Sequence, residues 1–275
     1  MDLWFYGKDV KRKGLPRAGV MGKQRKRQRV DAGPKGPVGT STPLHAACRG
    51  DDAGAVAAIL EDLRAKKLAA AVDARDEHGR TPLHLACWAG RGAAAALLLD
   101  AGAGAALGAQ DAMTALHFAS QAGCVAAVER LVAAGAPLDA ECTKSLKTPL
   151  HFAAARGHAA AVAALLAAGA DKDARGYLGA TAVCRAARRG HDDVLAALLD
   201  AGADPDVPND KMQSPLHFAA FKKNPKAVDL LLKHGASTLT LDRKGRTPAE
   251  DTSDADIRSA ILAARADRPA ESACA

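Results

Sequence analysis

Histidine and cysteine are the residues of this chain whose chemistry would allow a metal site, and its 275 residues include nine histidines and six cysteines. Zinc requires three or four such ligands, each about 2.0–2.3 Å from the ion. Five histidines occupy equivalent positions in copies of a repeated segment: His45, His84, His117, His151 and His217. Packed helices lie about 10 Å apart, too far for neighbouring copies to share one ion. We therefore expect structural histidines, with no metal and no cofactor.

The cysteines and the remaining histidines give no stronger indication of chemistry. No two cysteines have the C-x-x-C spacing of a zinc or redox motif. Cys48 and Cys87 follow the repeated segment at a position that favours a small apolar side chain, so we expect buried, inert thiols in a reducing compartment. His158 and His191 are expected to contact the start of the following helix. The chain lacks a glycine-rich phosphate loop, a G-x-S-x-G elbow and an HExxH motif, and we predict that it is not an enzyme.

The repeated segment itself must supply the elements that position these residues. Thr148-Pro149-Leu150-His151 opens one copy, and the copies begin at residues 42, 81, 114, 148, 181, 214 and 247. Their starts lie 39, 33, 34, 33, 33 and 33 residues apart. Five copies are followed by a Gly-Ala step, as at Gly169-Ala170. A period of 33 residues with this tetrapeptide resembles the ankyrin repeat family, and the resemblance covers residues 40–265.

The resemblance implies an all-α fold: an ankyrin-repeat solenoid of about seven stacked helix-turn-helix units with short hairpin-like fingers. The threonine at each start would cap the first helix, which stabilises each unit by about 1 kcal/mol. Leucines such as Leu150 would face the core, and the histidine would bond to backbone or to a neighbouring threonine. A glycine in the left-handed conformation is expected to end the first helix. These glycines are Gly90, Gly123, Gly157 and Gly190.

The fingers and the two ends of the array depart from the pattern. A glycine suits the turns at residues 76–80 and 242–246, but elsewhere Ala112, Leu146 and Met212 replace it. We predict altered turns there, with the leucine and the methionine at exposed tips. Six extra residues near 61–67 are expected to lengthen the second helix of the first unit. A polar helix near 254–262 is expected to cap the last unit, and residues 266–275 are expected to fray.

Residues 1–39 are predicted to form a disordered basic tail. Residues 1–40 contain 11 Lys and Arg against 3 Asp and Glu, whereas residues 41–275 contain 27 against 28. Two basic clusters separated by ten residues are typical of a two-part nuclear localisation signal that an import receptor binds. The clusters comprise Lys11 and Arg12, then Lys23, Arg25, Lys26 and Arg27. Attraction to nucleic-acid phosphates or another anionic surface, and simple solvation, remain alternatives.

Two further features of the chain bear on its location. Residues 3–6 hold three of the nine aromatic residues, and they are expected either to pack on the first unit or to dock on another protein. No apolar run approaches the roughly 18 residues that a membrane span needs, and the amino terminus lacks the apolar core of a secretory signal. We expect a soluble intracellular protein of the nucleus, the cytoplasm or both, with no membrane association.

The resemblance also implies a binding face, because partners of ankyrin proteins dock on the concave side. Aligning the copies places variable residues there, and those predicted to bind a partner are Trp88, Gln121, Arg156, Arg185, Arg188, Arg189, Phe221 and Lys222. Trp is the residue type most enriched in binding hot spots. The basic residues form a band that suits an acidic segment of a partner. The alternative is a solvated face partly neutralised by Asp192 and Asp193.

The function most consistent with these patterns is a non-enzymatic scaffold or adaptor that binds a protein partner and carries a nuclear localisation signal in its tail. One alternative is a nucleic-acid-associated protein that uses the tail and the arginine band. Another is a regulator or inhibitor of a kinase, a transcription factor or a ubiquitin ligase. The sequence does not predict the identity of the partner or the oligomeric state.

Overall fold

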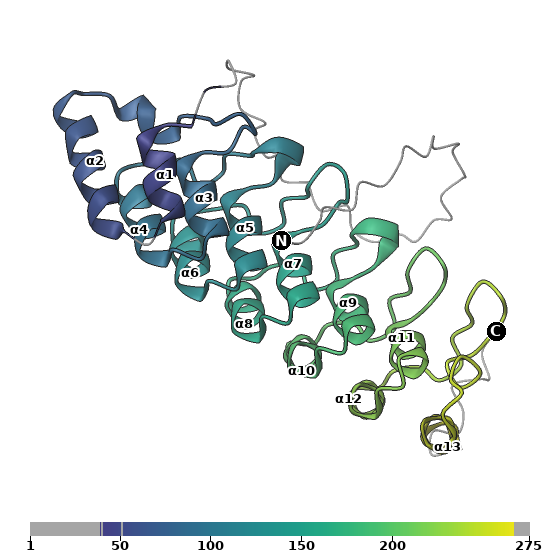
Figure 1. Ribbon diagram of the computed structural model, residues 1–275. Coiled ribbons are helices and arrows are strands. Elements are labelled where there is room, and N and C mark those ends of the chain that lie inside the picture. Colours follow the sequence, from purple (N-terminus) through teal and green to yellow (C-terminus); the bar gives the residue numbers. More distant parts are fainter. Residues whose placement is uncertain (1–38, 40, 51, 267–275) are drawn as a thin grey trace, which may run out of the picture.

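The computed structural model describes residues 39, 41–50 and 52–266, which form a row of stacked helix pairs (Figure 1). The first helices of the pairs are α1 (Pro43–Arg49), α3 (Pro82–Trp88), α5 (Ala115–Ala122), α7 (Pro149–Arg156), α9 (Ala182–Arg189) and α11 (Pro215–Phe221). The second helices are α2 (Ala53–Ala65), α4 (Gly92–Asp100), α6 (Val125–Ala133), α8 (Ala159–Ala167), α10 (Asp192–Asp200) and α12 (Pro225–Lys233). Helix α13 (Ala255–Ala266) ends the row, and short 3-10 helices occupy Ala69–Asp73, Gln110–Ala112 and Tyr177–Gly179. The predicted all-α solenoid is confirmed.

The helices pack in two layers because each buries one apolar side against its neighbours. Helices α3, α5, α7, α9 and α11 contact one another in series, and α4, α6, α8, α10 and α12 do the same. The leucines predicted to face the core are buried: Leu44, Leu83, Leu116, Leu150 and Leu216. Each contributes roughly 1.5–3 kcal/mol of burial free energy. The core therefore runs through the whole array, and each unit depends on the units beside it.

Successive pairs are joined by short hairpins, here called fingers. They comprise residues 76–80, 109–113, 142–147, 176–180, 209–213 and 242–246. In each finger the first backbone N–H donates to the last carbonyl, as Asn209 N does to Gln213 O at 3.0 Å. Bonds such as Asp210 N to Leu178 O, at 2.8 Å, also join neighbouring fingers. Among the described residues no backbone bond joins finger 142–147, which is one residue longer than the others, to finger 176–180.

The prediction that non-glycine residues alter the finger turns is correct in part: finger 109–113 has a second residue with a positive φ angle, Asp111 at 62°, and finger 142–147 is one residue longer than the others. Ala112, Leu146 and Met212 have φ angles of 56°, 49° and 60°, close to the 68° of Gly79 at the equivalent position. Stacking on neighbouring fingers holds the turn although the left-handed conformation costs such residues about 1–2 kcal/mol. Met212 is half exposed, as expected. Leu146 is only partly exposed, because it stands in the longer finger.

The repeated histidines link each first helix to the finger that follows. In α7, Nδ1 of His151 accepts from the backbone N–H of Thr148 at 3.1 Å. Nε2 must then carry the proton, and it donates to Ala180 O at 3.0 Å. We call this arrangement the histidine strut. His45, His84, His117 and His217 form it with Arg80 O, Leu107 O, Lys147 O and Arg246 O. Each histidine bonds its own threonine or serine, not that of a neighbour.

The predicted glycines do end or follow the first helices with positive φ angles, and two of them have a second role. A Cβ on Gly123 would lie 2.5 Å from Nδ1 of His158, so the glycine makes room for the imidazole. His158 Nε2 lies 3.1 Å from Gln121 O, and His191 Nε2 lies 3.3 Å from Ala155 O. These two histidines therefore contact the preceding unit, and the prediction that they contact the next helix start is wrong.

The two ends of the array differ from its middle as expected. Helix α2 has 13 residues against 9 in α4, so the first unit is longer by just over a turn. The last unit forms turns at residues 248–250 in place of a first helix, and α13 closes the row. There, Glu250 Oε2 accepts from Thr247 N at 2.7 Å, in the role of the missing histidine.

Some predictions fall outside the described residues. They concern the aromatic cluster at residues 3–6 and the import signal formed by Lys11, Arg12, Lys23, Arg25, Lys26 and Arg27. Fraying was predicted for residues 266–275. Ala266 is the last residue of α13, and residues 267–275 lie outside the described part of the chain. Within the described part of the chain, no helix combines the length and apolarity that crossing a bilayer would require.

Candidate partner-binding surface

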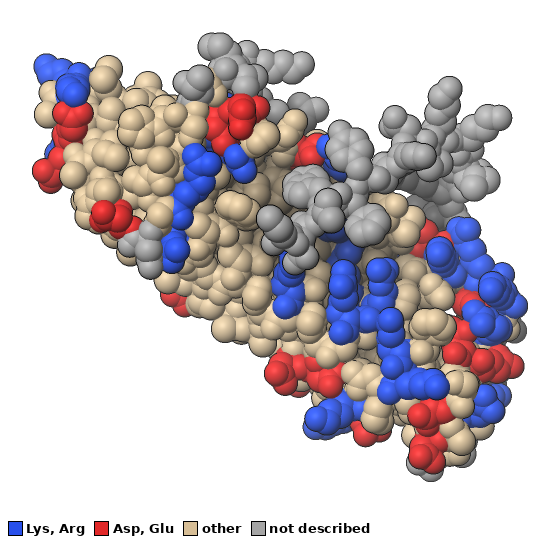
Figure 2. Space-filling view, in the orientation of Figure 1, with Lys and Arg blue, Asp and Glu red and all other residues tan. Residues whose placement is uncertain are grey.

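The predicted binding residues stand in a row along the first helices, from α3 to the end of α11. Trp88 and Phe221 are 51% and 65% exposed, which is unusual for large aromatic side chains and favours a binding role. The exposed basic residues of the row are Arg156, Arg188, Arg189 and Lys222, while Gln121 and Arg185 are half-buried. Figure 2 shows Lys and Arg gathered over α9 and α11.

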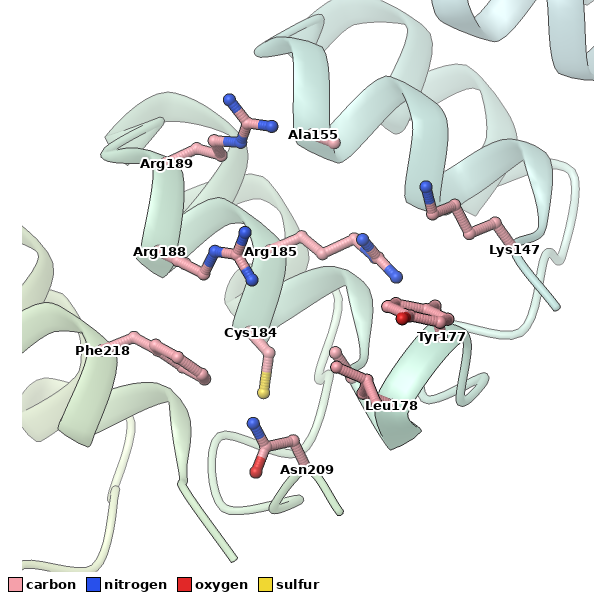
Figure 3. A pocket seen from close by; sticks show the side chains of 11 residues that line it. Lys147, Ala155, Tyr177, Leu178, Cys184, Arg185, Arg188, Arg189, Asn209 and Phe218 are labelled. Atoms are coloured by element: carbon pink, nitrogen blue, oxygen red, sulfur yellow. The ribbon is translucent and has the colours of Figure 1, made fainter. Parts of the chain in front are cut away.

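Part of this row surrounds a cavity of about 110 Å³ beside α9 (Figure 3). We call it the arginine pocket. Its lining residues are Lys147, Ala155, Tyr177, Leu178, Ala180, Cys184, Arg185, Arg188, Arg189, Asn209 and Phe218. The structure thus brings together three of the predicted residues, all from α9. Trp88, Gln121, Arg156, Phe221 and Lys222 do not line the pocket.

The residues around the arginine pocket come from three first helices (α7, α9 and α11) and three fingers (142–147, 176–180 and 209–213). Helix α9 presents Arg185 and Arg188 on one face because they are three residues apart. Finger 176–180 supplies Tyr177 and Leu178, and finger 142–147 supplies Lys147. The pocket lies where the two fingers lack a backbone bond to each other, so the break in the finger stack adjoins the cavity.

Among the six described helix pairs, the fifth is the one without a histidine strut. Cys184 occupies the histidine position, and its Sγ lies 3.5 Å from Val207 O, at the limit of a weak thiol hydrogen bond. Thr181 still caps the helix by accepting from Cys184 N. A thiol fills less space than an imidazole, and Cys184 lines the pocket. The loss of the strut therefore leaves room for the cavity.

A second exchange places a charge where the third, fourth and sixth units carry a phenylalanine. Phe118 packs edge-on against His84 of the preceding unit, with ring centroids 5.6 Å apart, and Phe152 packs in the same way against His117. In the fifth unit, Arg185 stands in place of this phenylalanine, beside His151 of the fourth unit. Burial lowers the pKa of His84 and His117 to about 4. Burial together with Arg185 lowers that of His151 to about 3.

The positive charges of the arginine pocket are not neutralised within the described part of the chain. No described carboxylate forms an ion pair with Lys147, Arg185, Arg188 or Arg189. Nε and Nη2 of Arg185 are buried and have no hydrogen-bond partner. Burial lowers the pKa of Arg185, and Arg188 lowers it further. The cations repel one another and are poised for an anion.

The acidic neighbours proposed as neutralising groups lie elsewhere. Asp192 accepts from Nδ2 of Asn224 at 2.6 Å. Asp192 and Asp193 instead line a separate recess with His191 and Lys226. The structure therefore argues against the interpretation of the band as a neutralised face.

Sequence comparison of the first helices did not predict the other pocket residues, of which Lys147, Tyr177, Leu178 and Phe218 have the largest side chains. Three of them stand in fingers, and aligning the finger positions would have shown Tyr177 and Leu178 where another finger carries Glu77 and His78. Phe218 stands in α11 at the position of Phe118 and Phe152. The pocket forms between units, and alignment within single units does not reveal such contacts.

Cys48 and Cys87 are buried, as predicted, and so are most of the other described cysteines. Of these, Cys142 and Cys184 are buried, and Cys124 is half-buried. Burial raises the pKa of Cys48 to about 12, which keeps the thiol protonated and unreactive. Among the described residues no three His, Cys, Asp or Glu side chains cluster in a way that would hold a metal ion.

Comparison with known proteins adds a sequence match and a structural match. A family model described as Ankyrin repeats (3 copies) matches residues 24–111, 103–176 and 183–251. The crystal structure of the human ASB11 ankyrin repeat domain superposes with a TM-score of 0.72 at 27% identity, covering 81% of this chain and 97% of that one. The ankyrin repeat domain of Bcl-3, described as a unique member of the IkappaB protein family, gives a TM-score of 0.70 at 26% identity, covering 81% and 98%.

Proposed function

Since the chain belongs to the ankyrin repeat family, we propose that it is a non-enzymatic adaptor whose row of first helices and fingers binds an acidic segment of a protein partner. Domains of this family mediate protein–protein binding, and the groove differs from one member to the next. The observation that carries the proposal is a set of four cations around the arginine pocket without a described ion pair, of which Arg185 is half-buried with two unpartnered nitrogens. Burying cations without a partner costs free energy, and a bound carboxylate or phosphate would recover it.

The exposed aromatic residues extend the proposed contact beyond the pocket. Trp88 lies on α3 and Phe221 at the end of α11, so they flank the basic residues on either side along the array. Large aromatic side chains combined with arginine are typical of binding hot spots. We therefore expect an extended partner segment that places acidic residues over α9 and apolar residues toward the two ends.

Site-specific photo-crosslinking tests where the partner binds. A photoreactive amino acid at Phe221 should crosslink to the partner in cells, whereas the same residue at exposed Asp229 of α12 should not. The crosslinked protein is then identified, purified and titrated against the full chain. Replacing Arg185, Arg188 and Arg189 with Glu should abolish its binding, and unchanged affinity would refute the proposal.

For the amino-terminal tail we propose a role as a nuclear import signal. The support is its composition, since the basic clusters hold their cations at the spacing that an import receptor recognises. Replacing Arg25, Lys26 and Arg27 with Ala should move a fluorescent fusion of the full chain out of the nucleus.

A matched control removes the same charge elsewhere in the tail. Replacing Lys8, Arg17 and Lys35 with Ala should leave the fusion nuclear, because these residues stand outside the two clusters. Equal effects of the two triple variants would indicate general attraction to nucleic acid instead.

A further inference from the structure

We propose that the arginine pocket binds a phosphorylated serine or threonine of the partner, so that phosphorylation of the partner switches the interaction on. This inference rests on the proposed function and specifies its chemistry. It concerns the anchoring group in the pocket, while the acidic and apolar residues of the partner contact the rest of the row.

The first argument is the orientation of the unsatisfied donors. Nε and Nη2 of Arg185 form the side-on edge of the guanidinium, the edge that binds two oxygens of one anion. Both atoms are buried and lack a partner. Figure 3 shows the head group of Arg185 beside Tyr177, inside the pocket. A tetrahedral phosphate can take both of these bonds and still offer a third oxygen to Arg188 or Lys147.

The second argument is the amount of charge. Four cations line a cavity of about 110 Å³, which has room for one phosphate group but not for a long stretch of chain. A carboxylate carries one negative charge, whereas a phosphate monoester carries about −1.5 to −2 near neutral pH. The repulsion among Lys147, Arg185 and Arg188 is therefore offset more completely by phosphate than by Asp or Glu.

The third argument concerns the kind of molecule that carries the phosphate. Tyr177, Leu178 and Phe218 form apolar walls, and Tyr177 and Leu178 are about half exposed. Such walls suit the apolar side chains of a peptide. A nucleic acid would need a continuous basic track for its regularly spaced phosphates. Residues 41–275 instead have 27 Lys and Arg against 28 Asp and Glu, and Figure 2 shows blue side chains over α9 and α11 but separated by tan and red surface from those at the two ends of the array.

The test uses the full chain and three pools of short fluorescent peptides that differ only in the central residue. That residue is phosphoserine, Glu or Ser, and the flanks are random mixtures of Asp, Glu, Leu and Phe. In fluorescence anisotropy titrations, the phosphoserine pool should bind at least about tenfold tighter than the Glu pool, because it gains an additional charge-assisted bond. A single-stranded RNA of equal charge should bind more weakly than the phosphoserine pool.

Matched variants connect the preference to the pocket. Arg188→Gln removes an exposed cation that lines the pocket, so the fold is retained, and it should reduce binding of the phosphoserine pool by about tenfold. Arg185→Gln should reduce it at least as much, with thermal unfolding measured in parallel. Arg156→Gln removes the same charge from the same row outside the pocket and should change the affinity by less than about threefold.

The outcomes separate this inference from the proposed function. Equal affinity for the phosphoserine and Glu pools overturns the phosphate pocket, and if charge reversal still abolishes partner binding, the proposed function stands. Equal losses in Arg156→Gln and Arg188→Gln also overturn it, because they would indicate general attraction. Tighter binding of the RNA than of every peptide pool overturns both.

Discussion

The fourth and fifth helix pairs have nearly the same backbone and carry different side chains. Helices α7 and α9 both have eight residues, follow a threonine cap, and end at a glycine with a φ angle of 81° or 75°. At the third and fourth residues of the helix, however, α7 has His151 and Phe152, and α9 has Cys184 and Arg185. In α7, His151 bonds the finger that follows. In α9, Cys184 and Arg185 instead line the arginine pocket.

This contrast separates the residues that build the array from those that we propose bind a partner. The cap, the core apolar residue and the helix-ending glycine are kept in the fifth unit, since stacking on α7 and α11 requires them. The histidine strut is dispensable at one unit because neighbours on both sides hold it in place. A unit that lacks a stabilising contact of the other units but keeps their fold is therefore the best candidate for the binding site.

The largest expected effect that tests the contrast is the pH dependence of stability. Folding lowers the pKa of His84 and His117 to about 4 and that of His151 to about 3, from 6.5. The unfolded chain therefore takes up protons first as the pH falls through 6.5, and stability is lost. From about pH 7.5 to 5.5 we expect a loss of roughly 4 kcal/mol in total, measured by urea denaturation.

Hydrogen exchange locates this effect. At the lower pH, amides of α3, α5 and α7 should lose protection more than those of α9, which has Cys184 in place of a histidine. A uniform loss across the array, or no loss, would contradict the assignment of the effect to the histidine struts.

The next largest effect is the loss of folding stability when one histidine strut is removed. His151→Ala should destabilise the chain by about 3 kcal/mol, because it creates a cavity and leaves Ala180 O and Thr148 N–H without their partner. Cys184→Ala is the matched control, and it should cost about 1 kcal/mol, since it removes a single small group. Equal losses in urea denaturation would show that the strut contributes nothing beyond packing.

A substitution in the opposite direction should convert the fifth unit into a copy of the others. Cys184→His is expected to form a strut to Val207 O, as His84 does to Leu107 O, and to raise stability by about 1 kcal/mol. The same imidazole would fill part of the arginine pocket and weaken binding of the phosphoserine pool by about tenfold. Cys184→Ser keeps the small volume and should leave binding unchanged, so equal affinities of the two variants would contradict the role given to the cavity.

The smallest effect concerns the finger tips. Met212→Gly should stabilise the chain by about 1 kcal/mol, because it relieves a positive φ angle of 60° at an exposed side chain. The reverse change on the next finger, Gly245→Met at a φ angle of 74°, should destabilise it by a similar amount. Thermal unfolding that moves both variants in one direction would show that the turn is not strained.

These comparisons show which parts of the molecule could be predicted from the sequence. Thr148, Leu150 and Gly157 recur at fixed positions within each unit, so their spacing was enough to predict the cap, the core and the helix end. The turn at Met212 could not be predicted, because stacking of fingers overrides the local preference for glycine. The arginine pocket was predicted only in part, since Lys147 and Tyr177 reach it from two different fingers.

The missing backbone bond between fingers 142–147 and 176–180 has a mechanical consequence. At the other joints from finger 76–80 to finger 242–246, a backbone bond fastens each finger to the next, so the array resists bending there. Between fingers 142–147 and 176–180 no described backbone bond does so, and helix packing with side-chain bonds such as Asp171 N to Asp139 Oδ1 connects the units. We expect this joint to bend more easily than the others, and a small rotation there would move both ends of the array appreciably. A ligand gripped by Lys147 on one side and Arg185 on the other would fix the curvature of the whole chain.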